Sequence, residues 1–453
     1  MTTVDGDPVP TRTARARFAL ALPLAATAPA VIISFTHPQL AHPVEALIYG
    51  MAIVGAAFML SWAAEVAQLD ISAGLAIAIL ALIAVLPEYA VDFVFASKGG
   101  ESFRLTGPAC LPLDGGTESP CSLALANMTG ANRLLIGVGW TMVVFIAFWQ
   151  LRRKGRLPAG KRWSGVRLDR AHTIEIAFLA AATIYSLTLP LKHSITLVDG
   201  AVLVCIFVLY TARVSRAPAE EPHLVGPAAY LGTLPTAWRR GVIVAQAVFA
   251  AAVILLVAEH FAESLVATGS ALGISEFVLV QWLAPLASEA PELLVAGLYA
   301  WRLNTNAGLG TLVSSKVNQW TLLVGTLPLV FAIAAGGLHG LPIDHLQRQE
   351  LFLTAAQSFF ALAVISSLTL SLREAGFLFA LFFGQFVLGA IVPARLHGVE
   401  LVVMGGVYLV LGAWVLVGER RNIPRLLRDG FRTPPGQLTE DEQRREKEFQ
   451  PAG

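Results

Sequence analysis

The sequence predicts an all-α polytopic membrane protein that contains two inverted five-helix repeats, one extra helix at each end, and about 12 transmembrane helices. Three observations carry this prediction: the composition, the number of long apolar runs, and a Pro-Glu pair that occurs twice in matching surroundings. The chain is 55% hydrophobic and only 14% charged. This balance is typical of proteins with several membrane spans and argues against an ordinary soluble domain.

The apolar runs set the number of predicted spans. A helix that crosses a bilayer needs roughly 20 mainly apolar residues. Twelve runs approach or exceed this length, at residues 18–36, 43–66, 72–97, 122–149, 171–190, 194–214, 241–266, 273–300, 308–336, 350–370, 374–393 and 399–417.

The basic residues predict the orientation, because they gather at one end of the alternating spans. They are Arg12, Arg15 and Arg17 before the first span, Arg152, Arg153, Lys154, Arg156, Lys161, Arg162, Arg167 and Arg170 after the fourth, Arg213, Arg216, Arg239 and Arg240 around the loop after the sixth, and Arg420, Arg421, Arg425 and Arg428 after the twelfth. The positive-inside rule places this side, and both termini, in the cytoplasm. We therefore expect a multi-pass protein of the inner (plasma) membrane. Its first apolar run has no clear signal-peptidase site and is expected to be an anchor.

The same orientation places the loop at residues 98–120 outside. It contains Cys110 and Cys121, two of only three cysteines. In an oxidising compartment they can form a disulfide that closes a small loop, and the alternative is two unpaired thiols. Cys205, in the sixth span, is expected to be a small core residue.

Each Pro-Glu pair lies within a membrane-length apolar segment, as Pro87-Glu88 and Pro291-Glu292. A carboxylate near the bilayer centre costs roughly 3 kcal/mol on insertion scales, so such residues usually face a polar cavity and have a function. A proline tends to break its helix, which frees backbone carbonyls beside the carboxylate. Two such pairs in matching positions indicate a transporter with its site at the interface of two repeats.

Further matches define the repeats. Ile71-Ser72 and Ile274-Ser275 precede the two Pro-Glu pairs at nearly the same spacing, residues 126–132 correspond to 310–316, and residues 194–200 correspond to 370–376. Each repeat then contains five spans, at residues 43–214 and 241–393. Because five is odd, the second repeat enters the membrane from the opposite side.

These motifs resemble those of the cation/calcium exchanger superfamily, which includes sodium/calcium and calcium/proton exchangers. That family has Gly-Thr-Ser-x-Pro-Glu in one helix of each repeat and Gly-Asn-x-x-Gly-Ser-Asn in the next, and residues 271–278 followed by 287–292 are the closer match. The resemblance implies a ten-helix core with ions held between the four motif helices. The expected organisation is residues 1–42 as a cytoplasmic N-terminus and extra helix, 43–214 as the first exchanger repeat, 215–240 as a cytoplasmic loop, 241–393 as the second repeat, and 394–453 as an extra helix and cytoplasmic tail.

The first repeat has fewer of the family's oxygen ligands, because the positions that carry polar side chains in the family are occupied here by Ala84, Val85, Ala131 and Leu135. Hard cations such as Ca²⁺ take six or more oxygens, so the family's multi-ion site is not expected intact. The resemblance implies a cation site with Glu88 and Glu292 as metal ligands and Lys316 as a coupling group or internal cation. The full expected set of cation-binding residues is Glu88, Glu292, Ser288, Glu289, Ser315, Gln319, Asp92 and Asn127.

Alternatives remain open for several of these residues. Glu88 and Glu292 could form structural pairs. Asp92 shares a helix face with Glu88, one turn away, or is a solvated acid at the external mouth. Lys316 needs a carboxylate partner, for which Glu289 or Glu292 would serve, and their ion pair could be structural or part of transport.

Two classes of function follow. One is a secondary active cation antiporter that works by alternating access, in which Glu88 and Glu292 bind a cation and Na⁺ or H⁺ in turn. The other is a transport-inactive protein that keeps the exchanger fold as a sensor or structural component. We find no enzyme motif such as a P-loop or a Gly-x-Ser-x-Gly elbow, and no sign of nucleic-acid binding. The expected partners are small inorganic cations such as Ca²⁺, Na⁺ or H⁺ and membrane lipid, without a further cofactor.

The predicted topology can be tested with single cysteines placed at positions 115 and 160 of a chain without its natural cysteines. Because the basic residues fix the orientation, an impermeant thiol reagent added outside should label position 115 and leave position 160 unlabelled. Labelling of position 160 from outside, but not of position 115, would overturn this topology.

Overall fold

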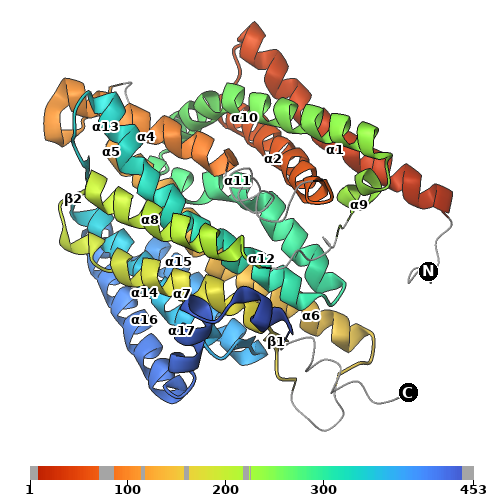
Figure 1. The fold of residues 1–453 in the computed structure, drawn as a ribbon. Coiled ribbons are helices and arrows are strands. Elements are labelled where there is room, and N and C mark those ends of the chain that lie inside the picture. The colour runs from red at the N-terminus through yellow and green to blue at the C-terminus, as the bar shows by residue number, and fades with distance from the viewer. Residues whose placement is uncertain are drawn as a thin grey trace, which may run out of the picture.

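The structure is a computed structural model that describes residues 9–70, 86–113, 118–157, 163–217, 224 and 226–440. Helices dominate the described residues, and Figure 1 shows their arrangement. They are α1 (Val9–Thr36), α2 (His42–Ala67), α4 (Leu86–Thr106), α5 (Pro120–Leu134), α6 (Thr141–Arg153), α7 (Thr173–Ser186), α8 (Leu197–Val214), α9 (Pro227–Gly232), α10 (Thr236–Leu272), α11 (Glu276–Trp301), α12 (Thr305–Asn318), α13 (Val324–Ala335), α14 (His345–Ile365), α15 (Leu372–Ile391), α16 (His397–Glu419) and α17 (Ile423–Phe431).

Shorter elements connect these helices. The π-helical segments Leu135–Trp140 (η2) and Gln319–Leu323 (η5) join α5 to α6 and α12 to α13. The 3-10 turns are Gly107–Ala109, Arg170–His172, Leu189–Leu191 and Ala394–Leu396, and the strands are β1 (Val166–Arg167), β2 (Ser194–Ile195), β3 (Leu341–Pro342) and β4 (Thr369–Leu370).

The protein is a multi-pass membrane protein. Ten helices or helix pairs of the described ranges are long and apolar enough to cross a bilayer. Two of the twelve predicted spans are not among them. The span at residues 72–97 lies partly outside the described residues, and the span at 350–370 overlaps α14, whose hydropathy is reduced by Arg348, Glu350 and Gln357. The total of about 12 therefore stays a prediction.

Short strand pairs display the inverted relation of the two repeats. β1 pairs with β4 and β2 pairs with β3, both antiparallel, so each pair joins one repeat to the other. β1 and β3 precede the corresponding helices α7 and α14, and β2 and β4 precede α8 and α15. Matching capping boxes, Thr196 with Asp199 and Ser371 with Glu374, begin α8 and α15 and satisfy backbone N–H groups at the two helix starts.

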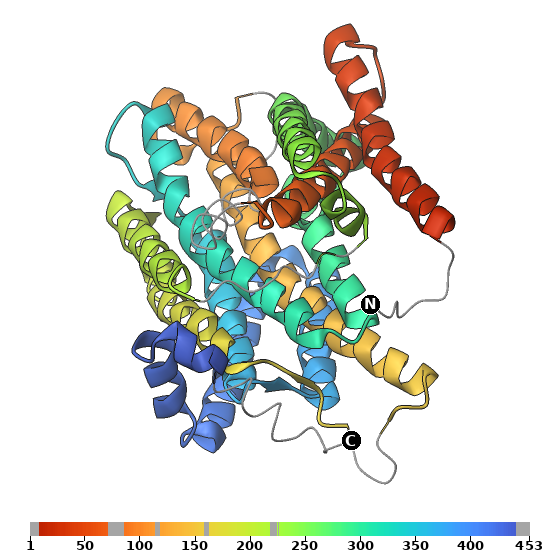
Figure 2. The ribbon, with the colours of Figure 1, turned by 45° about the vertical axis from the view of Figure 1, so that its right-hand side comes forward.

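Helices α1, α2, α9 and α10 form a group beside the remaining helices, as Figures 1 and 2 show. Within it, α2 and α10 lie in close contact, and Gly50 of α2 allows this because a Cβ there would come within 3.0 Å of the Phe261 ring. A separate apolar cluster under α9 contains Trp62, Leu231 and Ile243. The group thus has its own packing and is connected to the helices that carry the motif residues.

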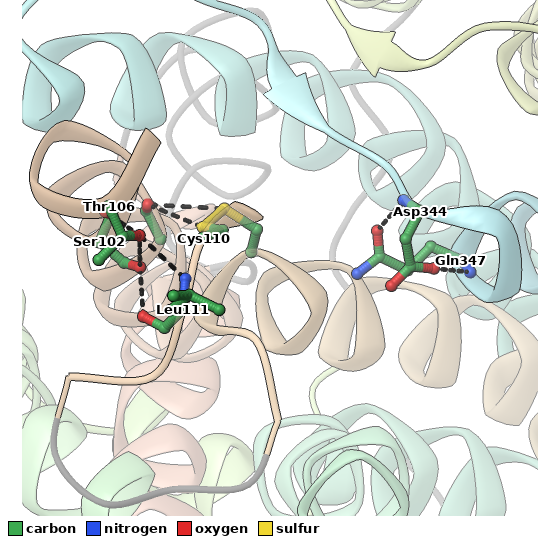
Figure 3. The surroundings of a disulfide bond; sticks show 8 residues. Ser102, Thr106, Cys110, Leu111, Asp344 and Gln347 are labelled. Atoms are coloured by element: carbon green, nitrogen blue, oxygen red, sulfur yellow. Dashed lines mark hydrogen bonds between the residues drawn. A yellow bond between two sulfur atoms is a disulfide. The ribbon is translucent and has the colours of Figure 1, made fainter. Parts of the chain in front are cut away.

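A disulfide joins Cys110 and Cys121 at the start of α5. Figure 3 shows the hydrogen bonds that fix its loop: Ser102 Oγ donates to the Leu111 carbonyl at 2.6 Å, and Leu111 N donates to Thr106 Oγ1 at 2.9 Å. The loop is therefore bound to the last turns of α4. The remaining cysteine, Cys205, is exposed on α8 and does not pack in the core as expected.

An ion-pair cluster joins the end of α2 to the start of α10. Arg239 donates from Nε and Nη2 to the two carboxylate oxygens of Asp70, each at 2.8 Å, and Arg240 Nε adds a bond of 3.2 Å. The hydrogen bonds from Arg239 hold the pKa of Asp70 below its ordinary value. The associated stability is present above the unfolded pKa of about 3.9 and is lost as pH falls through the lowered folded pKa.

We expect Asp70→Asn to lower the midpoint of thermal unfolding at neutral pH by a few degrees, because it removes the charge that both arginines contact. The difference from wild type should shrink as pH falls below about 4. Arg240→Gln is the matched control and should have a smaller effect, because Arg240 is largely exposed. A difference that does not depend on pH, or equal losses in the two variants, would contradict this account.

Candidate cation site

The motif residues come together where α4, α5, α11 and the junction of α12 with η5 meet. Glu88 lies in the first turn of α4, Glu289 in the middle of α11, and Gln319 at the start of η5. Contrary to the expected helix break, α11 is continuous through Pro285 and Pro291. The prolines still remove two backbone donors, so nearby carbonyls lose their usual partners.

Gln319 bridges two carboxylates at the centre of this site. Its Nε2 donates to Glu88 Oε1 at 3.1 Å and to Glu289 Oε1. All three side chains are buried, with Glu88 only 2% exposed. The bridge brings one carboxyl group of the first repeat and one of the second onto a single amide, so two titratable acids share a low-dielectric space. Like charges placed this way need a cation or protons to neutralise them.

Several buried oxygens around the bridge have no hydrogen-bond donor in the part of the chain that the structure describes. They are Glu289 Oε2, Gln319 Oε1, Glu292 Oε2, Asp92 Oδ2 and Asn127 Oδ1. An unpaired buried polar group costs about 1–3 kcal/mol. Carboxylate and amide oxygens are the ligands that Ca²⁺ prefers, so the chemistry of the set suits a hard cation.

Asp92 and Asn127 form a second pair beside the bridge. Asn127 Nδ2 donates to Asp92 Oδ1 at 2.6 Å, and Asp92 is only 1% exposed. Asp92 is therefore not a solvated acid at a mouth of the protein. It lies one helical turn from Glu88 on α4, and its charge acts on that residue.

Glu292 lies beside the bridge but is not joined to it by the Gln319 amide, and its role as a cation ligand stays a prediction. It is half-buried, Glu289 and Glu65 of α2 act on it electrostatically, and it in turn acts on Glu88. Glu65 Oε2 is also buried, with no donor in the described ranges. The Gln319 amide connects Glu88 to Glu289, not to Glu292. No three His, Cys, Asp or Glu side chains of the described residues are gathered closely enough to hold a metal ion by themselves.

Lys316 does not have the expected carboxylate partner. Its Nζ donates to the backbone carbonyl and to Oδ1 of Asn132, each at 2.6 Å, and lies 5.2 Å from the centre of the Trp320 ring. The side chain is fully buried. In the alignment of the repeats Asn132 is the counterpart of Lys316, so the two corresponding residues contact each other across the two-fold relation. No ion pair of Lys316 occurs among the described residues, although Glu289 and Glu88 act on it electrostatically.

The two serines contribute less directly. Ser288 Oγ donates to the carbonyls of Ala284 and Pro285 in its own helix, at 3.2 and 3.3 Å, which leaves its lone pairs available. Ser315 is half-buried, and its hydroxyl forms no hydrogen bond within the described residues. Of the expected set, Glu88, Glu289 and Gln319 are thus joined directly, Asp92 and Asn127 form the adjacent pair, and Glu292 and Ser315 stand outside these contacts.

Sequence reasoning left two residues out of the site. Asn132 is the last residue of the first-repeat segment that matches residues 310–316. Its amide side chain within an apolar helix could have indicated that it belongs to the site. Glu65 lies in the second predicted span, and its signal was again a carboxylate at membrane depth. No sequence motif around either residue predicts which residue it contacts, because the contacting residues lie on other helices.

The sequence and fold of this chain are similar to those of ion exchangers. The family model described as sodium/calcium exchanger protein matches residues 44–215 and 242–417. A solved structure titled as the H⁺/Ca²⁺ exchanger CAX is 39% identical, with a TM-score of 0.82, and the match covers 93% of this chain and 98% of that one.

A structure titled as the Ca²⁺/H⁺ antiporter protein YfkE matches in fold, with 15% identity, a TM-score of 0.56, and coverage of 87% of this chain and 100% of that one. A search of curated proteins gives no match.

Lys316→Asn tests whether the buried ammonium replaces a bound cation. The variant removes a positive charge and frees two oxygens of Asn132, so we expect the apparent affinity for Na⁺ or Ca²⁺ to rise and the charge moved per cycle to change. The measurement is cation binding to purified protein, followed by cation flux with the membrane potential clamped. Lys316→Met is the control: it also removes the charge and frees the oxygens of Asn132 but adds no oxygen ligand, so its affinity should rise less than that of Lys316→Asn. If affinity, pH profile and charge movement are all unchanged in Lys316→Asn, Lys316 has only a structural role.

Proposed function

This chain belongs to the sodium/calcium exchanger protein family, and from that premise we propose that it is a secondary active antiporter that exchanges Ca²⁺ for protons. Members of such a family move cations across membranes and are not catalytic enzymes. The observation that carries the finer proposal is the single amide bridge of Gln319 to Glu88 and Glu289. The 39% identity to a protein titled as an H⁺/Ca²⁺ exchanger supports the same choice of ions.

Charge balance supports protons as the countertransported ion. Two carboxylates are neutralised by one Ca²⁺ or by two protons, so a cycle that trades one for the other returns the site to the same net charge. Three Na⁺ with one Ca²⁺ require more oxygen ligands than the first repeat supplies, because Ala84, Val85, Ala131 and Leu135 replace the family's polar positions. At the matching positions Asn132 and Lys316, an amide and an ammonium contact each other, and neither residue supplies a carboxylate for a further cation.

In the proposed cycle, the carboxylates bind Ca²⁺ on one side, the site changes its access, and protons displace the ion on the other side. Gln319 keeps Glu88 and Glu289 together, and the Asp92–Asn127 pair supplies further oxygens. Alternating access at the interface of inverted repeats follows the general scheme of such transporters. No cofactor beyond the transported cations is included in the proposal.

The remaining parts of the proposal concern placement. We assign the two repeats to residues 43–214 and 241–393, and we place the protein in the inner (plasma) membrane with both termini in the cytoplasm. The asymmetric distribution of arginine and lysine supports this orientation. The competing function is a transport-inactive sensor or structural protein, in which the bridged carboxylates would be a static cluster.

Ca²⁺ flux in proteoliposomes distinguishes the two functions. A pH gradient should drive Ca²⁺ uptake, and Glu88→Gln or Glu289→Gln should reduce it by more than roughly 100-fold, since even indirect supports of metal ligands are worth 10–100-fold. Glu292→Gln is expected to abolish exchange as well, because one oxygen of its carboxylate is buried without a donor among the described residues and its charge acts on Glu88 and Glu289. Glutamine keeps the volume but removes the charge and the titratable proton.

Glu101→Gln is the matched control on α4, since Glu101 is exposed and pairs only loosely with Arg104 at 3.8 Å. Near-normal flux in a bridge variant would assign that residue a structural role. Absence of flux in the wild type under both pH and Na⁺ gradients would favour the transport-inactive protein.

A further inference from the structure

A cavity of about 550 Å³ lies at the corner between α1 and α2, where α10 closes it. Its lining includes His37 and His42 from this corner and His260 from α10, together with Glu45, Tyr49 and Glu263. None of its lining residues belongs to α4, α5, α11 or α12, so it is separate from the candidate cation site. Figure 1 shows α1, α2 and α10 side by side in this part of the molecule.

The residue types in this cavity differ from those of the cation site. Three of the nine histidines of the chain line one cavity. Imidazole nitrogen suits Zn²⁺ and the neighbouring transition metals, whereas Ca²⁺ takes oxygen ligands. The combination of imidazoles and carboxylates therefore selects a different class of cation from the one assigned to the Glu88 site.

The histidines are already close to a chelating arrangement. The ring centres of His37 and His260 are 6.3 Å apart. Two imidazoles on one tetrahedral zinc, with Zn–N of about 2.0–2.1 Å, place their ring centres roughly 5 Å apart. A small side-chain movement therefore brings both rings onto one ion. His37 has a positive φ of 43°, which is uncommon outside glycine and holds this corner in a specific shape.

Neighbouring groups orient the other members. Tyr49 stacks on the His260 ring at 5.3 Å with an interplanar angle of 24°. His42 Nδ1 lies 3.4 Å from Glu45 Oε2, the carboxylate–histidine contact that commonly supports a metal-bound imidazole. No three such ligands are yet gathered around one point among the described residues, so the third ligand, His42 or Glu263, must rotate into the cavity. Both are exposed side chains with room to do so.

Glu263 also connects the cavity to the helix that carries Glu88. Lys98 Nζ of α4 donates to Glu263 Oε1 at 2.7 Å, and this ion pair joins α10 to α4. A metal ion that recruits Glu263 competes with Lys98 for the carboxylate. Occupation of the cavity would thus change a contact between the α1–α2–α10 group and the helices of the cation site.

We propose that the cavity lined by His37, His42, His260, Glu45 and Glu263 is a regulatory binding site for a transition-metal cation of the Zn²⁺ class. The bound ion ties the α1–α2 corner to α10, releases Lys98 from Glu263 and slows cation exchange. The binding site stands on its own geometry, and only its effect on exchange rests on the proposed antiport.

Zinc binding to the purified full-length protein tests the site, by calorimetric titration with ZnCl₂ in excess Ca²⁺ and Mg²⁺. We expect one strong site in the wild type and in the double variant Glu88→Gln with Glu289→Gln, which removes the candidate transport ligands. His260→Gln and, separately, His37→Gln should weaken binding by roughly 10–100-fold or more. His345→Gln, at an exposed histidine of α14 outside the cavity, is the matched control and should bind as the wild type does.

Two binding results would overturn the site. One is unchanged affinity in both His260→Gln and His37→Gln. The other is loss of zinc binding in the Glu88→Gln and Glu289→Gln protein, which would place the ion at the transport ligands. Because His260 stacks on Tyr49, its variant is accepted only if its thermal unfolding remains cooperative, and the exposed His37 provides the independent variant.

The effect on exchange is measured as Ca²⁺ flux in proteoliposomes with and without Zn²⁺. Inhibition in the wild type and in His345→Gln, relieved in His37→Gln and His260→Gln, supports the coupling through Glu263. Zinc binding without any change in flux would refute that coupling. If no flux is found under any gradient, the proposed antiport fails while the titration still decides the metal site.

Discussion

Two carboxyl groups held together inside a membrane are the constraint on which this structure depends. Glu88 and Glu289 come from opposite repeats, and the Gln319 amide joins them within a buried space. In a medium of low dielectric constant such a pair is stable only with compensating donors, protons or a cation. The surrounding fold supplies donors incompletely, which leaves oxygens of Glu289, Gln319, Asp92 and Asn127 without protein donors in the described residues. A site with fully satisfied carboxylates would have little reason to bind an ion, whereas this one keeps oxygen ligands available.

The repeats are symmetric in fold and asymmetric in chemistry. The π-helical segments begin at the corresponding residues Leu135 and Gln319. The first residue of this segment is therefore apolar in the first repeat and an amide in the second. At the corresponding positions Asn132 and Lys316, the first repeat supplies oxygens and the second supplies a buried ammonium. The repeated fold therefore accounts for the positions of the polar groups, and the different residues at matching positions account for a single bridged carboxylate pair.

A second buried network holds the helix that carries these residues. Arg133, next to Asn132 on α5, donates to Glu350 of α14 at 2.7 Å and to Gln385 of α15, and it lies 5.1 Å from the Trp282 ring of α11. A buried guanidinium requires such partners because removal of one leaves an uncompensated charge. The network fixes α5 against α11, α14 and α15. It also gives Glu350 a buried partner, and Gln347 and Gln357 of α14 are buried as well.

The sequence by itself determined the class of protein, the approximate positions of most spans, the inverted repeats and the helices that meet at the site. These properties follow from apolar length and motif spacing, which are local and need no knowledge of packing. The tertiary structure decided which charges meet. It joined Glu88 to Glu289 through Gln319, placed Asp92 in the interior, kept α11 continuous through its prolines, and gave Lys316 the oxygens of Asn132 as partners. Each outcome depends on contacts between helices distant in sequence, such as α4 with α11 or α5 with α12, and a one-turn difference in their packing changes the partner. Spacing along one helix determines which face a residue occupies, but only the packed bundle determines what that face meets.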